Sequence, residues 1–292
     1  MRSIILIAAA ALASTSCRDK VPEANAYGNF EATEVLVSAE TSGRIMTFSA
    51  TEGTELSKGD ELALIDTTMY HLQKMEIDAS MKSVVTRINS VNAQNDILNQ
   101  QISNVNINIA RIENMLRNDA ATKKQYDDLT GQVEVFKKQI SANNTQRSSI
   151  SAELAVLESK KASLNEQISR SIVRSPLNGT LIEKYSEAGE ITAAGKPLAK
   201  IADLSTMKLK VYVSGAQLGS IKTGLECTVR TDNGKEEYIS FPGKITYISG
   251  KAEFTPKIIQ TKEERVTLVY AVTIDVANNG TLKSGMPGEA IF

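Results

Sequence analysis

The chain has 292 residues, enough for two or three small domains or for one domain with a large insertion. Its 33 basic and 34 acidic side chains nearly cancel, so no basic excess points to nucleic acid as a partner, and no run of like charges indicates a disordered tail. Trp is absent and aromatic residues make up 5% of the chain, which argues against a large globular core or an aromatic-lined ligand pocket. Such a composition is typical of a chain with much of its length in a narrow coiled-coil seam.

The first 16 residues have the features of a secretory signal peptide. Arg2 supplies a positive charge, and the apolar run over 4–13 is too short to span a bilayer core of about 30 Å as a helix. The small residues that follow and the first cysteine, Cys17, resemble the lipobox of bacterial lipoproteins, in which the cysteine is the cleavage point and carries the lipid. Leu12 lies further from Cys17 than the aliphatic residue of the usual box, so an ordinary cleaved signal peptide is the alternative. Residues 17–32 are expected to form an anchor linker and a strand of a later barrel.

Two segments on either side of a long central region repeat one another. Residues 33–69 and residues 172–204 share three glycines and three apolar residues, each recurring 136 positions later. The first copy of this set is Gly43, Gly53, Gly59, Leu62, Ala63 and Ile65. Identical glycine spacing predicts the same tight turns in both copies. Each copy alone would bury too little surface, so we expect the two to clasp into one small split β-sandwich.

The central region, residues 70–171, is predicted to be helical. It contains no proline and a single glycine, Gly131. Apolar residues recur there at alternating steps of four and three, first over 77–116 and again over 126–168. This spacing keeps one stripe of each helix facing a partner and is typical of a coiled coil.

A short turn over residues 117–121 would fold this region into an antiparallel hairpin, with Thr122 as the N-cap of the second helix. Folding about this turn pairs residues whose numbers add up to 238, which puts Asn95 opposite Asn143. A matched polar pair in an apolar seam fixes the register of two helices at some cost in stability. At about 1.5 Å per residue, arms of about 48 residues give a rod of about 70 Å.

Residues 205–292 are again rich in glycine and β-branched residues and predict a further β-structured unit. Cys227 lies there in a strand-like alternation, and we interpret it as a small core hydrophobe. A disulfide between Cys227 and Cys17 would compete with lipidation.

The order of these parts resembles a known family. A split domain of two such half-motifs, interrupted by a helical hairpin and preceded by a lipoprotein signal, is similar to the HlyD-type membrane fusion proteins, also called periplasmic adaptor subunits. Residues 241–249, 252–257, 263–266 and 285–288 look like the β-barrel of adaptors that serve ABC-type exporters. The resemblance covers nearly the whole mature chain. It implies an elongated α+β fold: a long antiparallel α-helical coiled-coil hairpin inserted into a split lipoyl-like β-sandwich, followed by a small β-barrel domain.

The resemblance also suggests an interaction site at the hairpin tip. Adaptors that meet a TolC-type outer-membrane channel carry an Arg, then a Leu, then a Ser at fixed spacing, and in this chain the pattern falls on Arg111, Met115 and Thr122. The last two are conservative departures from it. A cation, an apolar side chain and a hydroxyl around an exposed tip can dock between channel hairpins. The alternative is that Arg111 is a solvated flank and Met115 a filler beside the seam.

No catalytic, metal or cofactor site is expected. Lipoyl and biotinyl domains carry a modified lysine at a hairpin tip, but here the helical insertion follows Asp66 directly and occupies that place. We therefore expect no lipoyl or biotin cofactor and interpret Lys58 and Lys200 as surface charges. The single histidine, His71, has no cysteine neighbour with which to form a zinc site of the usual kind.

The predicted function is that of a non-enzymatic periplasmic adaptor in bacterial efflux or secretion. Lipid on Cys17 would anchor the chain to the inner membrane, facing the periplasm. The partners implied by the resemblance are an inner-membrane transporter, an ABC permease with its ATPase, a TolC-type outer-membrane channel, and further copies of the chain in a hexameric or trimeric ring. The main alternative is a structural coiled-coil envelope lipoprotein without a pump. An enzyme-linked lipoyl carrier would need the lysine-bearing hairpin, which is missing.

Overall fold

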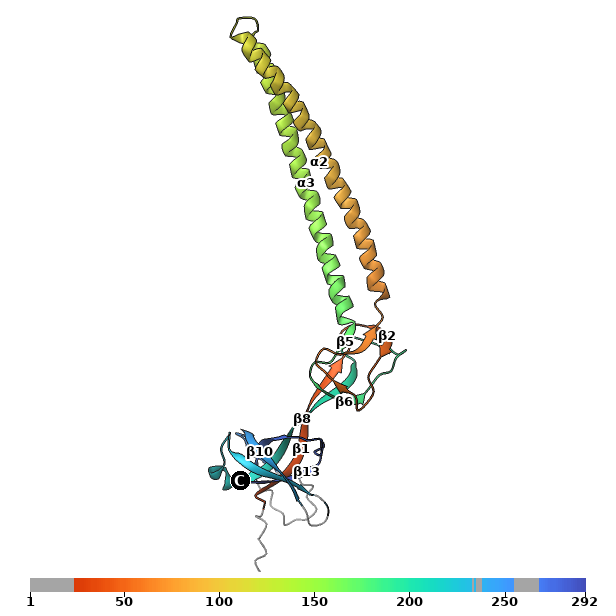
Figure 1. The fold of residues 1–292 in the computed structure, drawn as a ribbon, viewed down its shortest axis with the longest axis vertical. Helices are drawn as coiled ribbons and strands as arrows, with labels where there is room; N and C mark the ends of the chain where they lie inside the picture. The colour runs from red at the N-terminus through yellow and green to blue at the C-terminus, as the bar shows by residue number, and fades with distance from the viewer. Residues whose placement is uncertain (1–23, 233, 235–237, 255–267) are drawn as a thin grey trace, which may run out of the picture.

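The computed structural model describes residues 24–232, 234, 238–254 and 268–292. A long two-helix rod stands on a small β-domain, and a β-barrel follows at the opposite end (Figure 1). The expected elongated α+β fold with a hairpin inserted into a split lipoyl-like domain is confirmed. Cys17, the expected signal peptide and, from the barrel resemblance, residues 255–257 and 263–266 lie outside the described residues.

The rod consists of two antiparallel helices, α2 (Thr68–Leu116) and α3 (Lys123–Arg170). Each is long because nothing in its sequence interrupts the heptad spacing, and each buries only the stripe that faces the other. The buried residues are Val84, Val91, Asn95 and Val105 of α2 and Val133, Ile150 and Leu164 of α3. The rest of the surface of the rod is open to solvent or half-buried, so the rod has a seam and no thicker core.

The lipoyl-like domain contains a four-stranded sheet and the ends of two longer strands. The sheet has the order β5 (Ile172–Arg174), β4 (Glu61–Ile65), β2 (Gly43–Phe48) and β7 (Ile191–Thr192), so it mixes strands from before and after the rod. The short strands β3 (Glu55–Leu56) and β6 (Gly179–Lys184) pair in the same way across the insertion. The two half-motifs are therefore interleaved, as their clasping requires.

The internal repeat has the same backbone and core in both copies. Gly53 and Gly59 have φ of 87° and 97°, and their counterparts Gly189 and Gly195 have φ of 95° and 86°, which are left-handed values that favour glycine. The apolar members are buried in one cluster in both copies; these are Leu62, Ala63 and Ile65 with Leu198, Ala199 and Ile201. Each copy thus supplies half of one shared core.

Two strands run through both β-units and join them. Strand β1 (Ala26–Ser38) pairs with β8 (Pro197–Ser214) over nearly its whole length (Figure 1). Their upper halves belong to the lipoyl-like domain and their lower halves to the barrel. This long pairing makes the two units one continuous piece of sheet.

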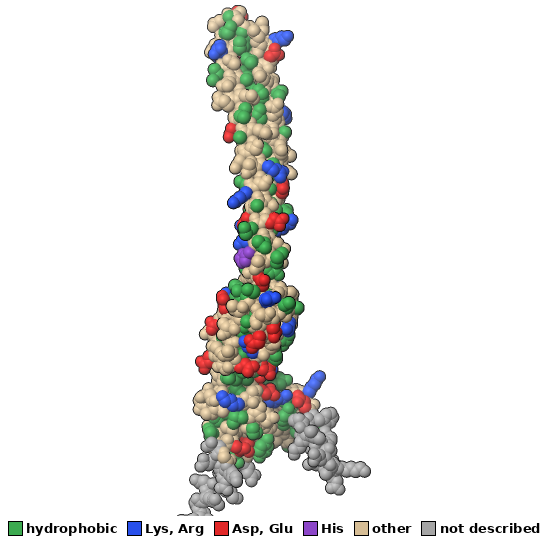
Figure 2. All heavy atoms as spheres, turned by 90° about the vertical axis from the view of Figure 1, so that its right-hand side faces the viewer, with side chains coloured by type: hydrophobic (Ala, Val, Ile, Leu, Met, Phe, Trp, Pro, Cys, Tyr) green, Lys and Arg blue, Asp and Glu red, His purple; other side chains and the backbone are tan. Residues whose placement is uncertain are grey.

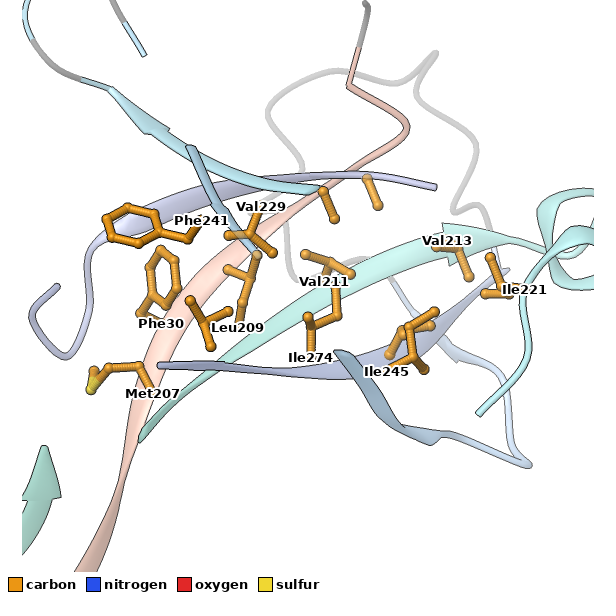
Figure 3. Close-up of a cluster of buried hydrophobic side chains, with 14 of the residues drawn as sticks. Phe30, Met207, Leu209, Val211, Val213, Ile221, Val229, Phe241, Ile245 and Ile274 are labelled. Atoms are coloured by element: carbon orange, nitrogen blue, oxygen red, sulfur yellow. The ribbon is translucent and has the colours of Figure 1, made fainter. Parts of the chain in front are cut away.

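The barrel closes because each of six strands finds two neighbours. Its order around the circle is β1, β13 (Pro287–Ile291), β9 (Glu226–Asp232), β10 (Tyr238–Ile248), β12 (Leu268–Ala277) and β8, which pairs with β1 again. A turn of 3-10 helix, Gln217–Ser220, and the short strand β11 (Glu253–Phe254) lie beside it. Figure 3 shows Phe30, Leu209, Val211 and Ile274 pointing into the interior, where they are fully buried.

Close backbone approach in the barrel depends on glycine. A Cβ on Gly28 of β1 would lie 1.7 Å from the carbonyl oxygen of Lys210 on β8. Any other residue at this position would push the two strands apart.

Candidate functional site

The tip of the rod is a compact turn in which backbone groups are satisfied locally. The Ala120 amide donates to the Met115 carbonyl oxygen over 2.9 Å, and the Asn118 side chain donates to the Asn114 carbonyl oxygen over 3.1 Å. Asp119 has φ of 52°, a left-handed conformation that Asp tolerates better than most residues. These contacts close the turn after Leu116, where α2 ends.

Thr122 forms the N-cap of α3 with a reciprocal capping box. The Gln125 amide donates to Thr122 Oγ1 over 3.4 Å, and the Thr122 amide donates to Gln125 Oε1 over 2.9 Å. The helix would otherwise leave its first amides without acceptors. The Thr122 hydroxyl is exposed, but part of its hydrogen-bonding capacity serves the helix.

Arg111 and Met115 lie one turn apart near the end of α2, and both are exposed, with Met115 39% accessible. Together with Thr122 across the turn they are at the far end of the rod from the β-domains (Figure 1). Within the described part of the chain, no hydrogen bond or ion pair joins the three to one another. The tip therefore offers a cation, a thioether and a hydroxyl to a partner.

The middle of the rod contains the polar pair expected in its seam. Asn95 is 8% exposed, the Asn143 side chain donates to Asn95 Oδ1 over 3.0 Å, and Asn95 in turn donates to Asn144 Oδ1 over 3.1 Å. Beside this layer, Arg147 Nη1 donates to Asn92 Oδ1 over 3.4 Å. The amides satisfy one another inside the seam, which a shift of one helix along the other would break.

Two ion pairs also cross the rod. Arg87 Nη1 lies 2.9 Å from Glu153 Oε2, and Lys161 Nζ lies 2.7 Å from Asp78 Oδ1. The hydrogen bond from Lys161 lowers the pKa of Asp78. Both pairs are largely solvated, so they set alignment more than stability.

The base of the rod is fixed to the lipoyl-like domain mainly through the end of α3. Ser171 is fully buried, its hydroxyl lies 3.1 Å from the hydroxyl of Thr41, and its carbonyl oxygen accepts from the Ile65 amide over 2.9 Å. At the start of α2, Asp66 Oδ1 accepts from the Thr68 amide over 2.9 Å. The direction of the rod is thus set by buried contacts with the β-domain.

Lys200, interpreted from the sequence as a surface charge, is partly exposed and forms ion pairs. Its Nζ lies 2.8 Å from Glu183 Oε2 and 3.7 Å from Glu34 Oε2, and the Tyr185 hydroxyl donates to the same Glu183 carboxylate. The hydrogen bond to Glu183 raises the pKa of Lys200, and the same bond lowers the pKa of Glu183. This cluster joins β1, β6 and β8, and sequence spacing gave no signal for it.

The thiol of Cys227 borders an open depression on the barrel, between β9 and β10, that is also lined by Phe241, Lys244 and Asp275. Partial burial raises the pKa of this thiol to about 11, so it is neutral at ordinary pH. The expected core role is therefore only partly met, because the residue packs against the core from its margin.

The described residues offer neither a cluster of metal ligands nor a membrane-spanning helix. They contain no group of three or more His, Cys, Asp or Glu side chains placed to hold a metal ion. None of the helices within them is long and apolar enough to cross a membrane.

This architecture also occurs in known proteins, as three comparisons show. A family model described as RND MFP, barrel-sandwich hybrid domain, matches residues 33–204. A UPF0194 membrane protein of Acidithiobacillus ferridurans is 25% identical over 97% of this chain and 92% of its own, and one of Yersinia enterocolitica is 25% identical over 91% and 88%. The crystal structure of MacA from Actinobacillus actinomycetemcomitans has a TM-score of 0.66 at 20% identity, covering 91% of this chain and 76% of that one. At this identity the structural likeness establishes the fold alone.

Proposed function

The chain belongs to the membrane fusion proteins, the non-enzymatic periplasmic adaptors of efflux and secretion systems, and from this membership we propose that it links an ABC-type inner-membrane exporter to a TolC-type outer-membrane channel. The observation that carries the proposal is the rod itself. Its helices of 49 and 48 residues end in an exposed tip, far from the β-domains. A rod of about 70 Å spans a distance that a compact domain of this size does not.

The membrane anchor is proposed to be lipid on Cys17. The described chain starts at the barrel, at the end of the molecule opposite the tip (Figure 1). An anchor there would set the barrel, residues 205–292 with the strand from 17–32, close to the inner membrane and the transporter. The rod would then point away from that membrane, toward the outer-membrane channel.

The ABC class of the transporter rests on the barrel sequence, in particular residues 241–249, 252–257 and 285–288. The channel contact rests on the exposed side chains of Arg111, Met115 and Thr122 at the tip. Copies are proposed to form a hexameric or trimeric ring around the transport path. The cargo would pass through this ring without any chemical step.

Cysteine crosslinking in cells tests the link to a channel. Met115→Cys and, as a matched exposed position in the middle of α2, Gln94→Cys are each made in a Cys227→Ser background, and captured proteins are identified by mass spectrometry. Capture of an outer-membrane channel by Met115→Cys and not by Gln94→Cys is the expected result. Capture of no channel and no transporter, with crosslinkers placed on the tip and on the barrel, would favour the envelope-spacer function instead.

A further inference from the structure

The outer edges of the rod, turned away from the seam, carry an unusual set of side chains. On α2 the outer edge is the exposed row, at steps of three and four, that passes through Ile97, Gln100, Asn104 and Ile107. Between Glu76 and Arg111 this row contains no charged residue. The outermost positions of a solvated coiled coil normally carry charges, so the composition of this row is not explained by exposure to water.

The outer edge of α3 is also uncharged over most of its length. It is the exposed row through Gly131, Val135, Lys138 and Ala142, and from Ala142 up to Glu166 it holds only small residues and Val156. Figure 2, in which the right-hand side of Figure 1 faces the viewer, shows hydrophobic side chains between uncharged and charged ones along the rod. Single exposed apolar residues are common on protein surfaces and indicate an interface only where the two edges match one another.

Side-chain contacts across the rod define which residues of the two helices lie at the same height. In each of these contacts the two residue numbers add up to between 238 and 240, and we call this the height rule. The contacts are the hydrogen bonds Asn95–Asn143 and Asn92–Arg147 and the ion pairs Asp78–Lys161 and Arg87–Glu153. This rule holds from the base to the middle of the rod and continues upward because both helices are unbroken.

At equal heights, the two isoleucines on the edge of α2 face small residues on the edge of α3, whereas Gln100, between them, is level with Lys138, which can leave its ammonium group in water. Ile107 and Ile97 are each 60% exposed. By the height rule, Ile107 is level with Gly131, and Ile97 is level with Ala142. The two members of each pair lie on opposite sides of one rod, so they cannot meet within a single chain.

Gly131 is the residue that the subunit itself does not explain. Glycine inside a helix costs about 0.5–1 kcal/mol relative to alanine. A Cβ at Gly131 would have no heavy atom within 4 Å, so no contact within the chain requires its absence. A neighbouring side chain seated on Gly131 would require it.

We propose that α2 of one copy packs along α3 of the next copy through these outer edges, with Ile107 seated on Gly131 and Ile97 on Ala142. The inference rests on the proposed adaptor function, since it specifies how copies meet around the transport path. The two edges differ, so the contact is heterologous and leaves a free edge on each side for further copies. Repetition of one such contact gives a ring when the rotation closes.

The match also fixes the relative height of neighbouring copies. A shift of one heptad along α3 would place Ile107 against Lys124 or Lys138, and a buried isoleucine would then press on a lysine that must keep its charge in water. Level copies bring all hairpin tips to one plane, which a channel opening can meet at every position.

Disulfide crosslinking of the full-length chain in membranes tests this contact. Ile107→Cys with Gly131→Cys, in a Cys227→Ser background, is expected to give a ladder of covalent oligomers that stops at the ring number. Matched controls are Ile107→Cys with Lys138→Cys and Ile107→Cys with Lys124→Cys, which sample the two shifted registers and are expected to give little product. A dimer from Ile107→Cys alone, or equal ladders in all three pairs, would overturn the proposal.

A second variant removes the receiving site without harming the helix. Gly131→Leu should abolish the ladder reported by the pair Ile97→Cys and Ala142→Cys, while its higher helix propensity keeps or raises the helical signal in circular dichroism. Adding Ile107→Ala to Gly131→Leu reverses the large and small partners and should restore the ladder. An unchanged ladder in Gly131→Leu contradicts the seating of Ile107.

Channel capture and the oligomer ladder, measured in the same cells, test the proposed function and the edge contact separately. If Met115→Cys captures a channel but the Ile107 and Gly131 pair gives no ladder, the edge contact is wrong and the adaptor function stands. If the ladder forms and no channel or transporter is captured, the edge contact stands and the link to a pump fails.

Discussion

The rod and the barrel are stabilised in different ways. Strand β12 of the barrel buries five of its ten residues, whereas α2 buries four of its 49. The barrel depends on contacts between strands that are far apart in sequence, and a misfit at one place affects all of them. The rod depends on many small contacts between residues at matched heights, so most single changes remain local. A region of the second kind can keep most of its surface free for partners.

The largest expected change in the free energy of unfolding comes from filling the space where β1 and β8 approach each other closely. Gly28→Ala places a Cβ against the Lys210 carbonyl oxygen and should destabilise the barrel by more than about 3 kcal/mol. Gly131→Ala, in open space on the rod, should instead stabilise its helix by up to about 1 kcal/mol. Urea unfolding of the purified chain, followed by tyrosine fluorescence for the barrel and helical circular dichroism for the rod, measures both. Equal effects of the two changes would remove the contrast between the regions.

Truncation of buried side chains should show the same contrast at a smaller scale. Ile274→Ala in the barrel core should cost about 2–5 kcal/mol, because the closed interior cannot collapse around the cavity. Val91→Ala in the seam should cost about 1–2 kcal/mol, since two methyl groups are lost from a site that borders water. The same unfolding curves report both values. A larger cost for Val91→Ala would indicate a tighter rod than the exposed surface suggests.

Removal of the cap tests how local the rod is. Thr122→Ala deletes the acceptor for the Gln125 amide and should destabilise the hairpin tip by about 1 kcal/mol. Thr130→Ala is the matched control, because its hydroxyl bonds only to carbonyl oxygens of the preceding turn. Hydrogen exchange should rise near residues 117–125 in Thr122→Ala alone. Faster hydrogen exchange at the base of the rod in Thr122→Ala would show that loss of the cap destabilises more than the hairpin tip.

The smallest effect concerns Cys227 at the margin of the barrel core. Its pKa is raised to about 11 by burial, so the unfolded chain loses the thiol proton at lower pH than the folded chain does. Stability from this group is therefore present below pH 9 and falls as the pH rises toward 11. Iodoacetamide labelling at pH 8 should be slow in the native chain and fast in urea. Rapid native labelling would show that the thiol is more exposed than the fold indicates.

Much of the architecture could be predicted from local patterns. The heptads over 77–116 and 126–168 define two helices, and Asn95 and Asn143 define their register because both patterns depend only on spacing along the chain. The glycines of the internal repeat work in the same way: a left-handed turn needs glycine wherever it occurs, so equal spacing at Gly53 and Gly189 predicts equal turns. Thr122 was predictable as a cap because its partner, Gln125, is only three residues away.

Other features depend on residues that meet only after folding. The spacing of residues does not reveal that Lys200 lies between Glu183 and Glu34, that Gly28 must pass beside Lys210, or that Ser171 is buried against Thr41. The closure of the barrel is of this kind as well, since β1 pairs with β8 and β13, whose residues come more than 150 positions later in the chain. The sequence alone therefore determined the rod, the repeat and the family resemblance, which follow from periodic local signals. Only the tertiary structure decided the closed barrel, the buried base of the rod and the ion pairs around Lys200, because these depend on where distant segments of the chain come together.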